Sequence, residues 1–183
     1  MKDVEAIAKF ADYLANVKNY SSNTVVSYRN DIEEFMHFVI TEKMAPNILG
    51  LRNNRVCKNF ISYLSSKELA STSINRKLSS LRNFYDFLLK SELVKGNFFN
   101  EVEAPKVPKR LPKTIKEKEI MMLFNSCDLT TPLGYRNYCI LEVLYGCGLR
   151  VSELCNMQIK DIDFEDLSIV IHGKGSKDRI VLM

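Results

Sequence analysis

The chain has 183 residues, 46% of them hydrophobic, and a net charge of +4 at pH 7. This length suits one large domain or two small ones, and so small a charge is only weak evidence for a polyanionic partner. Five cysteines without Cys-x-x-Cys spacing and two distant histidines argue against a metal site or a disulfide framework. With acids in the N-terminal segment and no apolar run near the roughly 18 residues of a membrane span, the sequence predicts a cytoplasmic protein without a membrane segment.

Apolar residues recur at helical spacing in four segments of the first ninety residues. These segments are 3–17, a second beginning after the cap cluster Ser21–Thr24, a third around 56–64, and a fourth from Ile74 to Leu88. The stripe of the second segment is Val25, Tyr28, Ile32, Phe35 and Val39. Four helices in so short a stretch predict a small four-helix bundle.

The outer face of the fourth predicted helix carries cations and small hydrogen-bonding side chains, with no acid before Asp86. Its members are Ser73, Arg76, Lys77, Ser80, Arg82 and Asn83. Such a face suits phosphate and groove contacts, because cations supply affinity and short polar groups allow close approach. An ordinary solvated face is the other interpretation, and the stripe by itself leaves both open.

Residues 105–116, PKVPKRLPKTIK, hold three prolines and five basic residues without an acid. Proline keeps such a segment extended, so it is typical of a linker between domains. Its Lys106, Lys109 and Arg110 could follow a nucleic-acid backbone or serve only for solubility. We therefore predict a first domain over 1–95, a linker over 96–114 and a second domain over 115–183.

The second domain is predicted to mix helices with a small hairpin. Helices are expected around 115–124, 138–146 and 150–156, followed by a turn at Asp161–Asp163. Strands are expected at 168–172 and 180–183, joined by Gly-Lys-Gly. The fold prediction is therefore mainly α, with the first part of an α+β domain after the linker. Since the chain stops inside the apolar run 180–183, we expect it to be a C-terminally truncated part of a longer protein.

Two residues of this domain could hold a phosphate. Arg150 follows Gly148, where the next helix should begin, so its guanidinium could bind two phosphate oxygens; an ion pair with Glu153 is the alternative. Lys174 stands between two glycines at the hairpin and could act as a point charge or donate a proton to a leaving oxygen. A solvated turn lysine is the more ordinary case.

Several motifs occur together and in order. They are Ser22-x-Thr24-x-x-x-Tyr28-x-x-Asp31-x-x-x-Phe35, the run Ser73–Tyr85, the linker from Pro105, Gly148–Leu154 and Gly173-Lys174-Gly175-x-Lys177-x-Arg179. On these motifs the whole chain resembles a tyrosine recombinase of the Xer type within the phage integrase family. It departs from the usual pattern at Cys147, where threonine is common, and at Phe98, where proline is common.

The resemblance implies a SAM-like core-binding bundle and part of a catalytic domain that cuts and rejoins double-stranded DNA through a 3'-phosphotyrosyl intermediate, without a cofactor. It implies that Arg150 is the first of two phosphate-clamping arginines, that Lys174 is the acid for the leaving oxygen, and that Glu153 supports them. The residues implied to contact DNA are Ser73, Arg76, Lys77, Ser80, Arg82, Lys106, Lys109, Arg110, Lys177 and Arg179. A second protomer in a tetrameric synapse is the implied protein partner, in dimer resolution or DNA integration.

None of the tyrosines is expected to be the nucleophile, because all eight precede Lys174. Helical spacing instead predicts that Tyr28, Tyr85, Tyr138 and Tyr145 lie in the core. We therefore expect this chain alone not to cleave DNA. A DNA-binding module without catalysis, or a helical interaction protein, are the remaining hypotheses.

Overall fold

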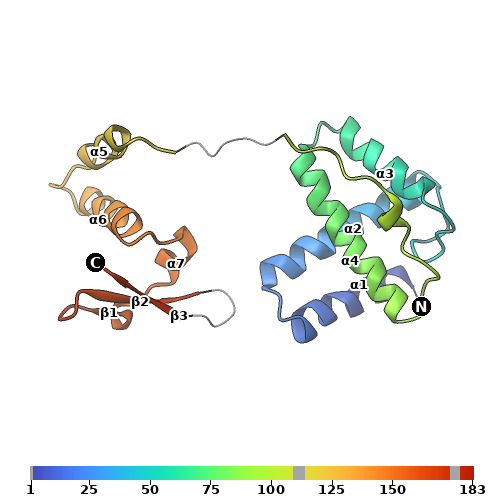
Figure 1. Cartoon of the computed structure of the whole chain (residues 1–183), viewed down its shortest axis with the longest axis horizontal. Helices are drawn as coiled ribbons and strands as arrows, with labels where there is room; N and C mark the ends of the chain where they lie inside the picture. The colour runs from blue at the N-terminus through green and yellow to red at the C-terminus, as the bar shows by residue number, and fades with distance from the viewer. Residues whose placement is uncertain (1, 109–113, 174–177) are drawn as a thin grey trace. The chain divides into compact units, whose positions relative to one another are not determined.

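The computed structural model describes residues 2–108, 114–173 and 178–183. The chain divides into two compact units, Met1–Lys109 and Arg110–Met183, each with its own hydrophobic cluster. Figure 1 labels their helices and strands. Across the described ranges, no helix combines the length and the apolar character needed to cross a bilayer.

The regular elements described in the first unit are all helices, which confirms the predicted bundle. Its elements are α1 (Asp3–Asp12), a π-helical turn η1 (Tyr13–Val17), α2 (Ser22–Thr41), α3 (Arg55–Ser66), α4 (Ser71–Lys90) and a 3-10 turn η2 (Phe98–Glu101). Ser21 is the N-cap of α2, as its side-chain chemistry predicts.

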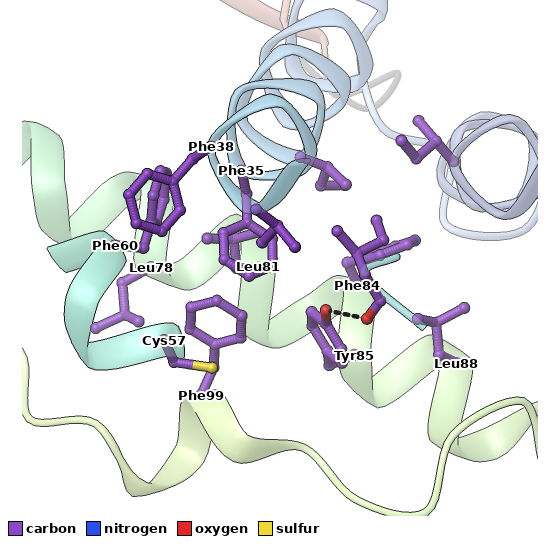
Figure 2. Packing of buried hydrophobic residues seen from close by; sticks show 14 of the residues in the cluster. Phe35, Phe38, Cys57, Phe60, Leu78, Leu81, Phe84, Tyr85, Leu88 and Phe99 are labelled. Atoms are coloured by element: carbon purple, nitrogen blue, oxygen red, sulfur yellow. Dashed lines mark hydrogen bonds between the residues drawn. The ribbon is translucent and has the colours of Figure 1, made fainter. Parts of the chain in front are cut away.

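Aromatic rings from separate helices fill the core of this unit, as Figure 2 shows. The Phe35 ring of α2 lies edge-on to Phe60 of α3 and Phe99 of η2, with centroids 5.0 and 5.1 Å apart. Tyr85 of α4 is buried, and its hydroxyl donates a 2.7 Å hydrogen bond to the carbonyl of buried Ile48. Burial raises the pKa of Tyr85 well above its usual value, so this phenol stays neutral and serves the core.

The second unit places three helices before a small sheet. Its elements are α5 (Glu117–Asn125), α6 (Pro132–Gly146), α7 (Val151–Asn156), a 3-10 turn η3 (Ile159–Asp161), β1 (Ile162–Asp163), β2 (Ser168–His172) and β3 (Asp178–Leu182). The sheet is antiparallel in the order β1-β2-β3, with Ile169 opposite Val181 and His172 opposite Asp178. The predicted hairpin of β2 and β3 is confirmed.

Three details of the second unit differ from the sequence prediction. The turn expected at Asp161–Asp163 is wrong, because Ile162–Asp163 forms β1 and pairs with β2. Helix α6 begins at Pro132, earlier than expected, because Thr131 caps it by accepting the Gly134 N–H at 3.1 Å. Tyr145 is 60% exposed instead of lying in the core.

The exposure of Tyr145 follows from the small core of this unit. Among the described residues, its buried apolar side chains are Leu149, Ile169 and Ile171. Leu144 packs against them, whereas Tyr145 lies outside this cluster, with its ring edge-on to Phe124 of α5 at 6.4 Å between centroids. The other predicted core tyrosines are buried (Tyr85) or half-buried (Tyr28, Tyr138).

Candidate functional site

An open cleft of about 1040 Å³ lies in the second unit around the start of α7. Gly148 has a φ of +61°, a left-handed conformation that glycine adopts without steric cost, and it turns the chain from the end of α6 toward α7. Arg150 then becomes the N-cap residue of α7. The cleft is lined by Gly148, Arg150, Ser152, Glu153, Asn156, His172, Gly173, Asp178 and Arg179.

The Glu153 carboxylate holds two arginines of the cleft. Arg179 of β3 donates from Nη1 to Oε1 and from Nη2 to Oε2, both at 2.8 Å. Arg150 donates from its backbone N–H to Oε2 at 2.9 Å and from Nη1 to Oε1 at 2.8 Å. The Glu153 side chain is only 6% exposed. The hydrogen bonds from Arg179 make the largest contribution to its pKa and that from the Arg150 N–H the next largest; together they outweigh burial and hold the pKa of this carboxyl well below its usual range.

The ion pair of Arg150 with Glu153, the alternative interpretation of the sequence, is therefore present. It leaves the arginine available, because the Arg150 side chain is still 76% exposed. A fixed carboxylate that orients exposed guanidinium groups makes a site suited to an anion with several oxygens, such as a phosphate. The sequence placed Arg179 near this region but did not predict that it would share Glu153 with Arg150.

His172, which the sequence did not indicate as a site residue, also lines the cleft. Its Nδ1 lies 3.1 Å from Oδ1 of Asp178, and its Nε2 lies 3.6 Å from Oδ1 of Asp161. The hydrogen bond with Asp178, aided by Asp161, raises the pKa of His172. Only the strand register, which places His172 opposite Asp178, could have indicated this contact from sequence.

Four of the predicted site residues lie outside the described residues: Lys109, Arg110, Lys174 and Lys177. Lys106 is described and exposed, and Ser73 is partly exposed in the first turn of α4. Gly173 and Asp178, which flank the segment of Lys174 and Lys177 in the chain, both line the cleft.

The cationic stripe of α4 is not a simple outer face, and this part of the sequence interpretation needs correction. Ser80 is fully buried, and the Lys77 side chain is only 14% exposed. Both contact Asp31 of α2, which is itself buried: Ser80 Oγ donates to Oδ2 at 2.7 Å and Lys77 Nζ to Oδ1 at 3.0 Å. The physical reason is that α2 supplies acids that the local sequence of α4 lacks.

Arg76 and Glu34 complete this cluster. Arg76 donates to Asp31 from Nη1 at 2.5 Å and from Nη2 at 2.9 Å, while Lys77 also donates to Glu34 at 2.6 Å. Desolvation lowers the pKa of Lys77, but the hydrogen bonds to Glu34 and Asp31 outweigh it, so the net pKa is raised. Lys77 therefore stays charged inside the cluster, and Arg76, with 49% of its side chain exposed, is the member that faces solvent.

Arg82 contacts the chain that follows the bundle. Its Nε donates to the carbonyl of Phe99 at 3.1 Å and its Nη2 to that of Val102 at 2.7 Å. Asn97 donates to the carbonyl of Arg82 at 2.9 Å, and Asn75 donates to that of Pro105 at 3.0 Å. Helix α4 thus fixes the start of the linker, and Arg82 has a structural task that its place in the stripe does not reveal.

In the described part of the chain, no three His, Cys, Asp or Glu side chains gather in a metal-binding arrangement. The five cysteines are free thiols. Burial raises the pKa of the Cys57 thiol to about 12, so it belongs to the core.

Comparison with known proteins gives matches to both units. Residues 7–92 match the phage integrase N-terminal SAM-like domain, and residues 113–183 match the phage integrase family. Tyrosine recombinase XerC of Bacillus licheniformis is 42% identical over 174 residues, covering 94% of this chain and 56% of the relative. XerC of Bacillus subtilis is 37% identical over 183 residues, covering 99% and 59%. The chain thus spans less than two thirds of the length of these relatives.

Two solved structures share the fold. A lambda integrase dimer bound to a COC' core site matches with a TM-score of 0.74 at 15% identity, over 100% of this chain and 62% of that one. The Tn1549 transposon integrase in complex with circular intermediate DNA matches with a TM-score of 0.68 at 19% identity, over 100% and 61%. With both units matched and relatives of this similarity, the chain belongs to the phage integrase family of tyrosine recombinases.

Proposed function

We propose that this chain is the DNA-binding and phosphate-contacting part of a site-specific tyrosine recombinase that acts in chromosome or plasmid dimer resolution or in DNA integration. The observation that carries the proposal is the cleft in which Glu153 holds both Arg150 and Arg179. XerC relatives near 40% identity support site-specific recombination as the reaction class.

In this proposal the cleft binds a scissile phosphate of double-stranded DNA. Attack on a phosphodiester builds negative charge on the non-bridging oxygens, which a fixed guanidinium stabilises more in the transition state than in the ground state. Arg150 supplies that guanidinium, and Lys174 protonates the leaving 5'-oxygen. The phosphotyrosyl bond keeps the energy needed for religation, so rejoining the strands needs no external energy source.

The nucleophile is not among the tyrosines of this chain in the proposal. All eight precede Lys174, and no tyrosine is among the described residues that line the cleft. Tyr85 in addition is buried with a raised pKa. We therefore propose that the chain by itself binds DNA without cleaving it, and that cleavage belongs to a longer protein working with further protomers in a tetramer.

We propose double-stranded DNA and further protomers as the partners of this chain. The lambda integrase and Tn1549 integrase structures of similar fold are complexes with DNA, one of them a dimer. The five free thiols fit the reducing cytoplasm, where we place the protein.

Titration of labelled duplexes of mixed sequence tests the phosphate site. We expect Arg150→Ala to weaken binding several-fold, because the exposed guanidinium of the cleft is lost. Lys160→Ala, which removes an exposed cation of η3 outside the cleft lining, should leave affinity nearly unchanged. Equal affinity of the Arg150→Ala variant and the unmodified chain would contradict the proposal for the cleft.

A nicked suicide duplex tests the second part. After denaturing electrophoresis we expect no covalent protein–DNA band from this chain, although it retains the duplex before denaturation. A phosphotyrosyl adduct would show that one of the eight tyrosines is a nucleophile. Absence of any salt-dependent duplex binding would contradict both the recombinase proposal and its alternative, a DNA-binding module without catalysis.

A further inference from the structure

Asp31 is a buried carboxylate surrounded by donors from α4. It accepts four hydrogen bonds, two from Arg76, one from Lys77 and one from Ser80. A buried carboxylate is costly unless it is paired and hydrogen-bonded, and here both oxygens of Asp31 have donors. Arg76 and Lys77 are consequently held against the bundle, about one turn of α4 from Ser80.

The geometry of the Arg76 pair leaves part of its guanidinium unused. Nη1 and Nη2 face the two oxygens of Asp31, so the end-on fork is occupied. Of the five N–H groups of an arginine, the Nε–H and one outer hydrogen on each Nη remain. The Nε–H and the outer hydrogen on the same side form a second, side-on fork. In the ranges that the structure describes, Nε has no hydrogen-bond partner, and half of the side chain is open to solvent.

The same cluster has little net charge. Arg76 and Lys77 contribute two positive charges, while Asp31 and Glu34 contribute two negative ones, at contact distances of 2.5 to 3.0 Å. Lys67 adds a looser pair at its edge, with Nζ 4.0 Å from Glu34 Oε1. Lys77 is largely buried, so it cannot replace a counterion on a phosphate without breaking its own pairs. A count of cations along α4 therefore overstates the charge that this surface offers to DNA.

We propose that Asp31 is a positioning residue of the DNA-binding surface: it holds Lys77 inside the bundle and takes one fork of Arg76, so that α4 presents a single oriented, charge-compensated arginine to double-stranded DNA. The inference rests on the proposed function, because it assumes that α4 faces the duplex. The second fork of Arg76 suits either a phosphate or the acceptor edge of a guanine.

The dependence of binding on salt tests the role of Asp31. Asp31→Asn raises the net charge of the cluster by one, and one additional phosphate neutralised changes the slope of log K against log salt by about −0.9. We therefore expect the Asp31→Asn variant of the full chain to bind a labelled mixed-sequence duplex with a slope steeper by about 0.9. In the double variant Asp31→Asn, Arg76→Gln, the slope should return to that of the unmodified chain.

Glu42→Gln is the matched control, because it changes the net charge equally at an exposed residue that has no ion pair among the described residues. Thermal melting followed by circular dichroism establishes that each variant is folded. A merely structural role of Asp31 would lower the melting temperature without changing the slope. An unchanged slope in folded Asp31→Asn, or an equal steepening in Glu42→Gln, would overturn the proposal.

If the Asp31→Asn variant does not fold, the Arg76→Lys variant tests whether the orientation of Arg76 affects DNA binding. Lysine keeps the charge but has no second fork, so we expect the same salt slope and an affinity several-fold lower than that of the unmodified chain. Unchanged affinity would show that the orientation of Arg76 is irrelevant and would overturn the proposal. If the unmodified chain shows no salt-dependent duplex binding, the proposed function fails, whereas a bound duplex with no response to these variants refutes only the role of Asp31.

Discussion

Replacing Arg82 with methionine separates a structural from a DNA-binding role for this residue. Methionine keeps most of the apolar stem but removes the donors to the carbonyls of Phe99 and Val102, 3.1 and 2.7 Å away. Phe99 and Val102 are buried, so each carbonyl loses a charge-assisted hydrogen bond worth about 1.5 kcal/mol. We expect the free energy of unfolding to fall by about 3 kcal/mol, twice that value.

Urea denaturation of the full chain, followed by far-UV circular dichroism, measures this loss. Arg52→Met is the control, since Arg52 is exposed and makes no hydrogen bond among the described residues. The salt slope of duplex binding should stay the same in the Arg82→Met variant. A stability loss below about 1 kcal/mol together with a shallower salt slope would refute the structural role and return Arg82 to the DNA-contacting residues.

Three further predictions concern the core, the turn before α7 and the histidine of the cleft. Phe35→Ala should destabilise the first unit by about 3–5 kcal/mol in urea denaturation, because the ring is fully buried, whereas Val26→Ala on the exposed side of α2 should cost less than about 0.5 kcal/mol. Gly148→Ala should cost about 1–2 kcal/mol through its left-handed φ alone, since an added Cβ meets no atom within 4 Å; in the same denaturation assay Gly146→Ala, in α6, should not destabilise the chain. The raised pKa of His172 should stabilise the fold fully below pH 6.5, its usual value, and this contribution should be lost as pH rises through the folded-state pKa. In the His172→Gln variant, the melting temperature should change less with pH across that range than in the unmodified chain. Equal pH dependence of the two melting temperatures would contradict the ion pairs of His172 with Asp178 and Asp161.

The helices of the first unit could be predicted because their signals are local. The stripe from Val25 to Val39 repeats at helical spacing, and Ile32, Phe35 and Val39 within it are buried. Similarly, the alternation around Ile169 and Ile171 predicts a strand with one covered face, and both residues are buried. The start of α6 could also have been predicted, because Thr131 is a favourable N-cap residue and Pro132 follows it. Apolar periodicity alone does not detect this signal.

The contacts that define the sites could not be predicted in the same way, because they join residues far apart in the chain. Asp31 and Arg76 are 45 positions apart, and only the packing of α2 against α4 brings them together. The hydrogen bonds of Arg82 to the chain beyond η2 likewise depend on where that segment folds back. Residue type indicated that α4 is polar and cationic, but not whether each cation faces solvent or a buried acid.

Both units contain a nearly buried carboxylate that holds a partly exposed arginine. This arrangement explains why the net charge is a poor guide to DNA binding by this protein. In the first unit, the nearly buried Asp31 carboxylate accepts hydrogen bonds from both Nη atoms of Arg76. In the second unit, the nearly buried Glu153 carboxylate accepts hydrogen bonds from both Nη atoms of Arg179 and from Nη1 of Arg150. Each carboxylate cancels charge but fixes the direction of a guanidinium that stays partly exposed. Since exposed lysines and arginines otherwise lose side-chain entropy when they bind, an arginine already held in place loses less. A protein built in this way can bind a polyanion through a few oriented groups while its net charge remains only +4, and its salt dependence should be correspondingly shallow.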